Sequence, residues 1–200
     1  VLMMYLVMGF FVYHLKSKKL ILASGSTRRQ ELLKSLGVPF EIRLKEIDEI
    51  YPKRLKKSEI SDYLAKLKSD AFIEELNPKD LLITSDTIVW HQNTALGKPK
   101  SKEDAFKMLQ KLSGKTHEVI SSVCLTSLQK EDIFNSITKV TFKELSTKEI
   151  QFYIDNYNPM DKAGAYGIQD WIGQIGVTKI EGSYFNVMGF PIHKIYSQLL

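Results

Sequence analysis

A strand, a tight turn and a helix start follow one another near the N-terminus, and this order restricts the fold more than any other part of the chain. Leu20 to Ala23 is a short apolar run typical of a buried strand. Ser24-Gly25-Ser26 forms the turn, and Thr27 followed by Gln30 is a capping-box pattern that predicts a helix start. Gly37 predicts the end of the helix. The stretch therefore predicts a βα unit, the building block of α/β folds.

Arg28 and Arg29 lie in the first turn of this predicted helix, where cations are normally unfavourable. A helix N-terminus carries partial positive charge, so each cation there costs roughly 0.3–1 kcal/mol. The unpaired N–H groups and both guanidiniums favour an anion, and phosphate is the obvious candidate. The alternative is a pair of solvated surface arginines. The turn is not a Walker A loop, because no G-x-x-x-x-G-K-[ST] pattern occurs in the chain.

Composition narrows the class of protein. With 200 residues, of which 44% are hydrophobic and 26% charged, the chain has enough apolar mass for one globular domain. The net charge of +5 suits an anionic small ligand, and no basic arm or aromatic RNA-binding motif supports nucleic acid as a partner. The single cysteine, Cys124, excludes an intrachain disulfide and indicates a reducing compartment, so a cytoplasmic location is expected.

Residues 1–13 are almost wholly apolar, but they are too short for a transmembrane helix, which needs about 20 residues. They lack the basic start and the small-residue cleavage site of a signal peptide. We interpret residues 1–15 as an apolar extension outside the fold and residues 16–200 as a single domain, and we expect no membrane partner. A membrane anchor is the alternative for the apolar run.

Hydrophobic periodicity and turn residues predict the remaining elements. Strands are expected at Phe40–Leu44, at Leu81–Ser85 with an extension through Trp90, at Thr116–Leu128 and Asp132–Phe142, and as a final pair at Ile175–Glu181 and Tyr184–Met188. Helices are expected at Ser58–Leu76, from Ser101 to Gly114, from a capping box at Ser146 to Tyr157, and at Pro191–Leu200. The polar stretch from Lys45 to Lys57 is expected to be a loop.

Three side chains that could take part in catalysis or ligand binding lie beside these predicted elements. Asp86 follows a buried run, and functional groups gather at the carboxyl ends of strands in α/β sheets, so it is a candidate for metal or base chemistry. A plain turn residue is the alternative. Lys98 lies between a glycine and a proline that would hold its ammonium against a phosphate, or it is a solvated turn lysine. Lys68, at the edge of an apolar stripe, on its own indicates only snorkelling to water.

The segment Asp161 to Asp170 is rich in small residues, which allow close approach of the backbone to a ligand. Within it, Tyr166 could stack on a ring, and Gln169 could make paired hydrogen bonds to a base edge. A glycine-rich surface loop is the alternative.

Taken in chain order, seven short motifs resemble the Maf family of nucleotide pyrophosphatases over about residues 18–200. They are Ser24-Gly25-Ser26-Thr27-Arg28-Arg29, Asp48-Glu49, Leu64 to Lys68, Asp86-Thr87, Gly97-Lys98-Pro99, Leu112 to His117 and Lys162 to Gln169. Each motif alone is weak, whereas seven in the right order form a specific signal.

The resemblance implies an α/β fold of the Maf/ITPase type, with an elongated mixed sheet flanked by helices and two lobes around a deep cleft. It implies metal-dependent hydrolysis of nucleoside triphosphates between the α and β phosphates, which releases the monophosphate and pyrophosphate. The Gly-Ala-Tyr-Gly-Ile-Gln form is similar to the branch that acts on dTTP and UTP. Removal of non-standard nucleotides, a link to cell-division control and a homodimer are further implications.

Residue by residue, the resemblance also implies a site. The catalytic residues would be Asp86, Lys68 and Lys98, with Asp86 as the base or metal-held activator of the attacking water. The substrate-binding residues would be Ser24, Arg28, Arg29, Thr87 and Gln169. The divalent metal, Mg²⁺ or Mn²⁺, would be held by Glu49 and Asp86, because hard cations prefer oxygen ligands.

Two positions depart from the family pattern, and three other functions remain alternatives. Thr27 replaces the usual proline, and Asp170 replaces a usual glycine and adds negative charge near the presumed base pocket. The alternatives are hydrolysis of a different or modified nucleotide such as 7-methyl-GTP, a non-catalytic nucleotide-binding regulator of division, and a nucleic-acid-binding module. The presence of Asp86, Glu49 and Lys98 argues against the regulator, and the scattered charges argue against nucleic-acid binding.

Overall fold

The computed structural model describes residues 18–200, so the predicted extension over residues 1–15 lies outside the described residues. The strands are β1 Lys19–Leu22, β2 Phe40–Ile42, β3 Asp80–His91, β4 Thr94–Leu96, β5 Thr116–Thr126, β6 Glu131–Phe142 and β7 Val177–Glu181. They form one seven-stranded sheet in the order β2-β1-β3-β5-β6-β7, with β4 paired to β3. β1 is parallel to β2 and β3, and the other pairs are antiparallel. The predicted α/β fold with an elongated mixed sheet is confirmed.

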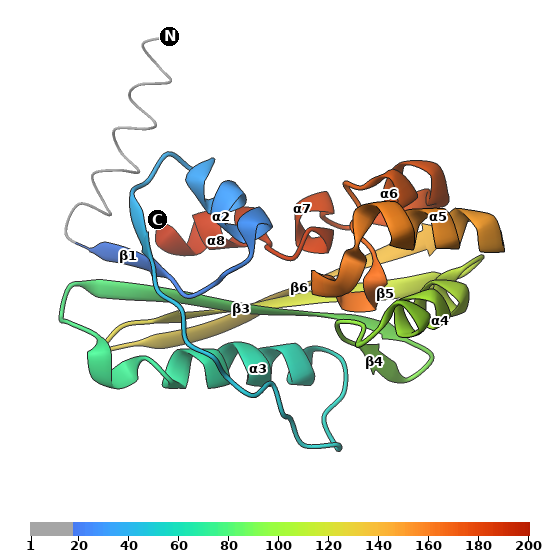
Figure 1. The fold of residues 1–200 in the computed structure, drawn as a ribbon. Coiled ribbons are helices and arrows are strands. Elements are labelled where there is room, and N and C mark those ends of the chain that lie inside the picture. The colour runs from blue at the N-terminus through green and yellow to red at the C-terminus, as the bar shows by residue number, and fades with distance from the viewer. Residues whose placement is uncertain (1–17) are drawn as a thin grey trace, which may run out of the picture.

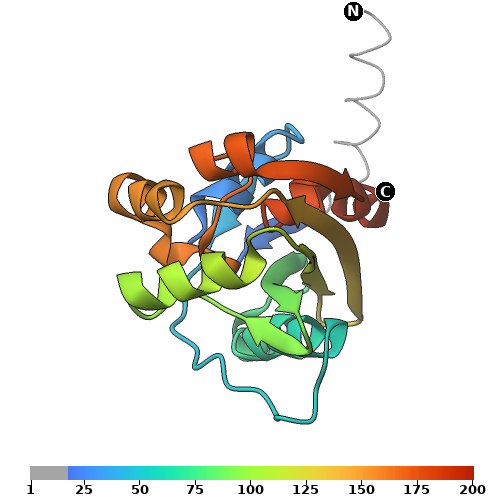
Figure 2. The same cartoon turned by 90° about the vertical axis from the view of Figure 1, so that its right-hand side faces the viewer.

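Helices cover both faces of this sheet (Figure 1). They are α2 Thr27–Lys34, α3 Ser58–Asp70, α4 Lys102–Leu112, α5 Thr147–Tyr157, α6 Trp171–Gly176, α7 Tyr184–Val187 and α8 Ile192–Leu199, with short 3-10 turns η1 Ile73–Glu75, η2 Pro159–Asp161 and η3 Ala163–Ala165. In Figure 2, α3 (teal) lies toward the bottom of the molecule, and α5 and α6 (orange to red-orange) lie toward its upper left. No helix within residues 18–200 is long and apolar enough to cross a membrane.

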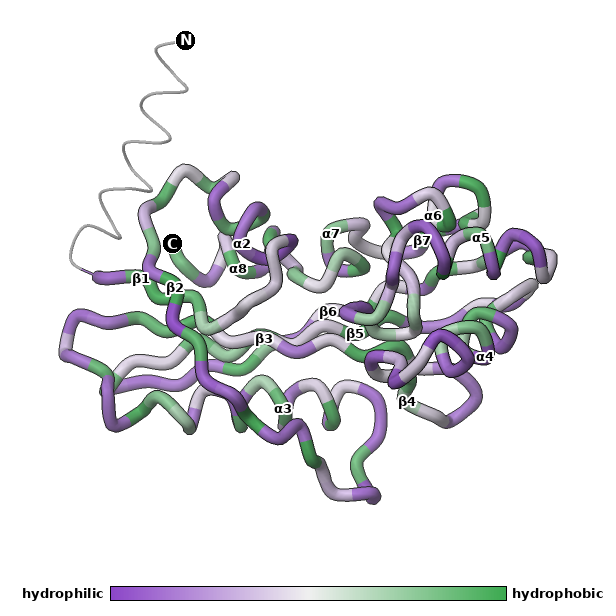
Figure 3. The backbone as a smooth tube through the Cα atoms, viewed as in Figure 1, coloured by the Kyte–Doolittle hydropathy of each residue, from purple (hydrophilic) through white to green (hydrophobic). Residues whose placement is uncertain are grey.

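Two apolar clusters lie on the face of the sheet opposite α3, one toward each end. The first packs α2 and α8 on β1, with Leu22 and Leu33 fully buried. The second packs α4, α5 and α6 on β5 and β6, with Leu109 and Tyr153 fully buried. Figure 3 shows hydrophobic residues where these elements pack and hydrophilic residues along the connecting turns. The two clusters are the cores of two lobes, because each helix buries its apolar side only against its own end of the sheet.

Several predicted boundaries differ from the structure. The second strand ends at Ile42 instead of Leu44. The predicted helix Ser58–Leu76 ends at Asp70 and is followed by the 3-10 turn η1. The N-cap of α2 is Ser26, whose hydroxyl accepts a hydrogen bond from the Arg29 backbone N–H, so the Thr27–Gln30 capping box was wrong by one residue.

The predicted final strand pair was also wrong. β7 begins at Val177 and pairs with β6, while Tyr184–Val187 is the short helix α7. Its cap is Ser183, whose hydroxyl accepts from the Asn186 backbone N–H. The buried Asn186 side chain donates to Val119 O at 3.0 Å and to Thr138 Oγ1 at 2.9 Å. These tertiary contacts select the helix over the strand that the local apolar pattern favours.

Candidate active site

A gap along one edge of β3 creates the site. β1 pairs with β3 only as far as Ile83, and β4 pairs with it only from Val89. Residues 84–88 therefore have no strand neighbour on this edge, although β5 continues along the other edge. Asp86 lies in the middle of β3 and not at a strand end as predicted. It nevertheless lies just beyond the carboxyl end of the parallel strand β1, the kind of position at which ligands bind in α/β sheets.

A cavity with a volume of about 590 Å³ opens at this gap. All nine side chains predicted as site residues line it: Ser24, Arg28, Arg29, Glu49, Lys68, Asp86, Thr87, Lys98 and Gln169. The wall also contains cationic Lys45 and Lys162 and the carboxylate of Asp161, so cations outnumber carboxylates. The excess of positive charge makes the cavity suitable for a polyanion.

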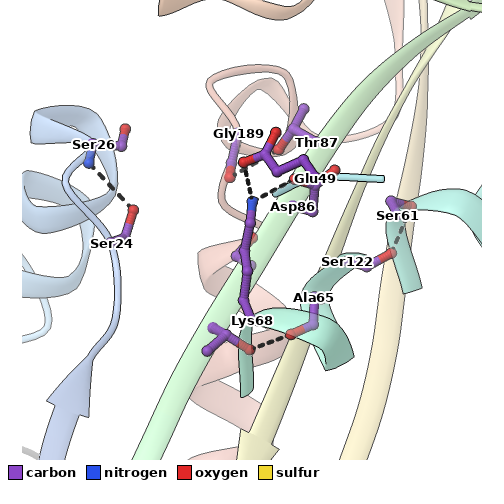
Figure 4. Close-up of polar contacts among 12 residues, drawn as sticks. Ser24, Ser26, Glu49, Ser61, Ala65, Lys68, Asp86, Thr87, Ser122 and Gly189 are labelled. Carbon is purple, nitrogen blue, oxygen red and sulfur yellow. Dashed lines mark hydrogen bonds and ion pairs between the residues drawn. The ribbon is translucent and has the colours of Figure 1, made fainter. Parts of the chain in front are cut away.

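Lys68 connects the two candidate metal-binding carboxylates (Figure 4). Its ammonium is 2.6 Å from Asp86 Oδ1 and 2.8 Å from Glu49 Oε1. Lys68 comes from α3, Asp86 from β3, and Glu49 from the loop after β2. The alternative in which Lys68 only extends its charge to water does not hold, because its side chain is 15% exposed and its ammonium is paired with both carboxylates.

Burial and charge act differently on the two carboxylates. Burial raises the pKa of Asp86 above its ordinary value, and the attraction of Lys68 and Arg29 offsets only part of this effect. Burial also acts to raise the pKa of Glu49, but Lys68, Lys98 and Arg29 outweigh it, so this pKa is lowered. Asp86 is therefore the more basic of the two and the better proton acceptor.

The donor set fits a divalent cation only in part. The Lys68 ammonium contacts both carboxylates, which shows that Asp86 and Glu49 can share one cation. Within residues 18–200, no group of three or more His, Cys, Asp or Glu side chains is arranged to hold a metal. Two carboxylates fit Mg²⁺ or Mn²⁺ when substrate phosphates and water supply the remaining ligands, which is the usual arrangement for Mg²⁺ with nucleotides.

Arg29 holds the cavity wall together. Its Nη1 donates to Ser85 O at 2.7 Å, on the open edge of β3. Its Nε donates to Gly189 O at 2.9 Å, and its Nη2 donates to Thr87 Oγ1 at 3.1 Å. The Thr87 hydroxyl is also 2.9 Å from Ser121 Oγ. Arg29 thus gives the Ser85 carbonyl on the open edge of β3 a hydrogen-bond donor, and two of its five N–H groups remain for a ligand.

Arg28 makes a different contact, which sequence reasoning missed. Its Nη1 is 2.8 Å from Asp161 Oδ2, and Lys162 Nζ is 2.7 Å from Asp161 Oδ1. Asp161 and Lys162 both line the cavity. They belong to the segment from Asp161 to Asp170, which the sequence indicated as a ligand contact because of its small residues. The adjacent opposite charges of Asp161 and Lys162 were the signal that could have identified them as polar residues of the site.

The serine turn and the Gly97-Lys98-Pro99 turn face the cavity from opposite lobes. Ser24 Oγ accepts from the Ser26 backbone N–H at 3.2 Å, as Figure 4 shows. Lys98 is 58% exposed and its ammonium is 3.7 Å from Glu49 Oε1. Gly97 O accepts from the Gly164 backbone N–H at 3.0 Å, which attaches this turn to the Asp161–Asp170 segment. Lys98 is more exposed than Arg28, Lys45, Lys68 and Lys162, and it therefore lies within reach of an incoming phosphate.

Gln169 and Tyr166 both line the cavity, but the polar atoms of their side chains have different surroundings. Gln169 lines the cavity, and its Oε1 is buried without a hydrogen-bond partner among the described residues. Tyr166 is only 5% exposed, and its hydroxyl is 2.7 Å from His117 Nε2. Its ring also packs edge-on against Phe142 at 5.0 Å. The ring of Tyr166 is therefore held by core contacts at the cavity wall, and stacking on a nucleotide ring stays a prediction.

Asp170 was predicted to add negative charge near the base pocket, and its Oδ2 lies 3.8 Å from Nζ of Lys162, which lines the cavity. Its carboxylate does not line the cavity and accepts from Tyr153 Oη at 2.6 Å. The aspartate that replaces glycine therefore lies behind the cavity wall, where it contacts Tyr153.

A buried carboxylate beside an ammonium, in a cavity lined by further cations, suits an enzyme that acts on phosphate anhydrides, because the cations offset phosphate charge and the carboxylate can accept a proton. Residues 19–200 match the family described as Maf-like protein, and the chain belongs to this family.

Three curated relatives with high sequence identity are named dTTP/UTP pyrophosphatase. The dTTP/UTP pyrophosphatase of Flavobacterium psychrophilum is 60% identical over 185 residues, which cover 92% of this chain and 95% of the relative. The protein of the same name from Flavobacterium johnsoniae is 58% identical over 185 residues, with coverage of 92% and 95%. That from Christiangramia forsetii is 52% identical, with coverage of 92% and 94%.

One solved structure is a distant neighbour. The nucleoside-triphosphatase / dITP/XTP pyrophosphatase of Mycobacterium abscessus aligns with a TM-score of 0.39 and 13% identity, over 64% of this chain and 75% of that chain. This likeness is too weak to define the fold or the site.

Proposed function

We propose that this chain is a dTTP/UTP pyrophosphatase, which hydrolyses the α–β phosphate bond to give the nucleoside monophosphate and pyrophosphate. The observation that carries the proposal is the meeting of all nine predicted site residues at one cavity on the open edge of β3. Relatives up to 60% identical over 95% of their length bear this name, and this supports the choice of substrate.

Asp86 is proposed to take the proton of the attacking water. Its carboxylate is buried, and its pKa is raised, which makes it a stronger base than an exposed aspartate. Lys68 holds that carboxylate in place at 2.6 Å, and its charge offsets part of the rise in the pKa of Asp86. Burial thus makes the Asp86 carboxylate more basic, and Lys68 fixes its position, which are the two properties that a general base needs.

Glu49 and Asp86 are proposed to hold a divalent cation, Mg²⁺ or Mn²⁺, together with the substrate. When bound, this cation would polarise phosphoryl oxygens and lower the pKa of a coordinated water. Lys68 would then give up its contact with Glu49, keep its contact with Asp86 and turn its remaining N–H groups toward a phosphate oxygen. Glu49 lies on a loop and is 39% exposed, so it can move to accommodate this exchange.

The triphosphate is proposed to lie between the two lobes. Arg28, at the start of α2, and Lys98, on the opposite lobe, would bind its outer phosphates and offset the charge that grows on the leaving pyrophosphate. Ser24 and the backbone N–H groups at the start of α2 would bind the remaining oxygens.

Gln169 is proposed to select uracil and thymine over cytosine. Its buried Oε1 needs a donor. Uracil and thymine carry a hydrogen on N3 and an acceptor at O4, which match the Oε1 and Nε2 of the amide as a pair. Cytosine presents an acceptor at N3, which would leave Oε1 unsatisfied.

Asp86→Asn tests the chemical role. The change retains the shape of the side chain but removes the base, so pyrophosphate release should fall by about 10³-fold or more, and the melting temperature should stay near that of the unaltered protein. Asp132→Asn, on an exposed strand end, is the matched control and should retain full activity. A near-normal rate for Asp86→Asn would exclude Asp86 as the base.

A further inference from the structure

The hydroxyl of Tyr153 ties together two residues of the base-side turn. Tyr153 lies on α5 and is fully buried. Its hydroxyl donates to Asp170 Oδ2 at 2.6 Å and accepts from the Gly167 backbone N–H at 3.0 Å. Burial, together with Asp170, raises the pKa of Tyr153, so the hydroxyl stays protonated and keeps its donor.

These contacts lie directly behind Gln169. Gly167 and Gln169 line the cavity, whereas Tyr153 and Asp170 do not. The turn from Gly167 to Asp170 is closed by a backbone hydrogen bond from Asp170 N to Gly167 O at 3.1 Å. Tyr153 therefore pins both ends of a turn whose inner member presents its amide to the ligand.

The turn has no room for adjustment at Gly167. A Cβ added there would lie 2.5 Å from Asp170 Oδ2 and 2.9 Å from Gln169 Nε2. Because real Cβ atoms essentially never approach so closely, the carboxylate and the amide are packed against the same backbone atom. Any displacement of the Asp170 carboxylate therefore opens space into which the Gln169 amide can turn.

We propose that Tyr153 and Asp170 are positioning residues for base recognition: by pinning Gly167 and packing behind Gln169, they fix the orientation of the amide that reads the base. The inference rests on the proposed function for its choice of nucleotides. A fixed amide favours binding of a base with a donor at N3 over binding of cytosine, because a mobile amide could turn over and pair with cytosine as well.

The direct test is Tyr153→Phe, with pyrophosphate release measured for UTP and CTP. These nucleotides share a sugar and differ only at the pyrimidine N3 and C4 positions. The change removes the acceptor of the Gly167 N–H and the hydroxyl donor of the Asp170 carboxylate, which keeps only its longer contact with Lys162 Nζ at 3.8 Å. We expect kcat/KM for UTP to fall about tenfold, mainly through KM, and kcat/KM for CTP to change less. The preference for UTP over CTP should therefore fall several-fold, while kcat for UTP stays within about twofold.

Three further variants separate positioning from general stability. Asp170→Asn retains an acceptor for the Tyr153 hydroxyl and should keep the wild-type preference. Asp170→Gly removes the acceptor at a partly exposed site and should lower the preference, even if Tyr153→Phe fails to fold. Tyr157→Phe removes the hydroxyl of the neighbouring ring, which stacks on Tyr153 with centroids 5.3 Å apart, and should change nothing.

A second readout needs no substrate. The Gly167 amide hydrogen should exchange roughly tenfold faster in Tyr153→Phe, because the buried N–H has lost its acceptor, while exchange along α5 stays unchanged. Wild-type protein that prefers another nucleotide would refute the proposed function, and the exchange measurement would still decide whether Tyr153 orders the turn. An unchanged preference and unchanged exchange in both Tyr153→Phe and Asp170→Gly would overturn the inference.

Discussion

Arg28 and Arg29 are adjacent in sequence but have different partners. Arg29 donates to two backbone carbonyls and to Thr87, so its place is set by the folded chain itself. Arg28 is paired with Asp161, whose side chain is 60% exposed at the cavity. A nucleotide phosphate can displace the Asp161 carboxylate, whereas displacing the partners of Arg29 would open the β3 edge. Of the two arginines, Arg28 is therefore the one whose side chain can turn toward the substrate without opening the β3 edge.

Replacing Asp161 with Asn should improve nucleotide binding. The carboxylate competes with phosphate for Arg28 and Lys162 and repels the triphosphate. An exposed pair of this kind contributes up to about 1 kcal/mol, so KM should fall roughly two- to fivefold while kcat stays nearly constant. Steady-state kinetics with dTTP measures both values. The control is Asp155→Asn on α5, which breaks an exposed ion pair with Lys102 of α4. A higher KM in Asp161→Asn would instead show that the carboxylate holds Arg28 in its binding position.

His117 should make the stability of the fold sensitive to acid. Burial lowers the pKa of His117 to about 3, with a smaller contribution from His91. The unfolded chain binds a proton near the ordinary value of 6.5, so the native state has its full stability above pH 6.5 and loses it progressively toward pH 3. At pH 5 the loss should be about 2 kcal/mol.

Urea unfolding at pH 7 and pH 5 measures this loss. His117→Gln removes the titrating group, so its free energy of unfolding should change less between the two pH values than that of the wild-type protein. His193→Gln, at an exposed position on α8, should leave the pH dependence unaltered. An equal pH dependence in wild type and His117→Gln would contradict the assignment.

At the scale of elements, α3 packs against the sheet through small and polar side chains. Ser61, Ala65 and Ser69, at successive four-residue steps, are fully buried. Ala65 O accepts from Thr84 Oγ1 at 2.7 Å, and Ser69 Oγ is 2.6 Å from Thr126 Oγ1. This close approach sets the depth at which Lys68, on the same helix, reaches Asp86.

Ala65→Leu should therefore impair catalysis more than stability alone explains. The added atoms have no space, so the helix must shift, at a cost of about 1–3 kcal/mol. The shift would move Lys68 away from Asp86, and kcat should fall at least tenfold in protein that is still folded. Urea unfolding and kcat on the same sample separate the two effects. Tyr63→Leu, on the exposed side of α3, is the control. Full kcat in a folded Ala65→Leu variant would show that helix depth does not control the site.

Elements with a strong local signal were predictable. The capping box that begins α5 is present as predicted, since Ser146 and Glu149 each accept from the backbone N–H of the other. The β7–α7 region was not, because a buried amide of Asn186 decides it through contacts distant in sequence. The position of Asp86 within β3 was missed for the same reason. The sequence indicated a functional carboxylate, but only strand pairing reveals that β1 ends before it and leaves the β3 edge open.

At the scale of the whole molecule, the two lobes share one sheet, and the polar residues of β3 separate their cores. The motifs that resemble the Maf family allowed the nine site residues to be named from sequence, and the structure brings them together at one cavity. Sequence could not show which of them support the wall and which remain available to a ligand, because that depends on partners far away in the chain. The Arg29 contacts, the Asp161 contact and the Tyr153–Asp170 support are all of this kind.

The most direct test of the central claim is pyrophosphate release by the purified chain, with Mg²⁺ or Mn²⁺, across the common and 7-methylated nucleoside triphosphates. Rapid release from dTTP and UTP, with CTP, purine and methylated nucleotides much slower, is the result that the cavity and Gln169 lead us to expect. Release from a different nucleotide would contradict the base assignment and leave the phosphate chemistry in place. Absence of release from every nucleotide, in protein that binds them, would contradict the enzymatic function itself.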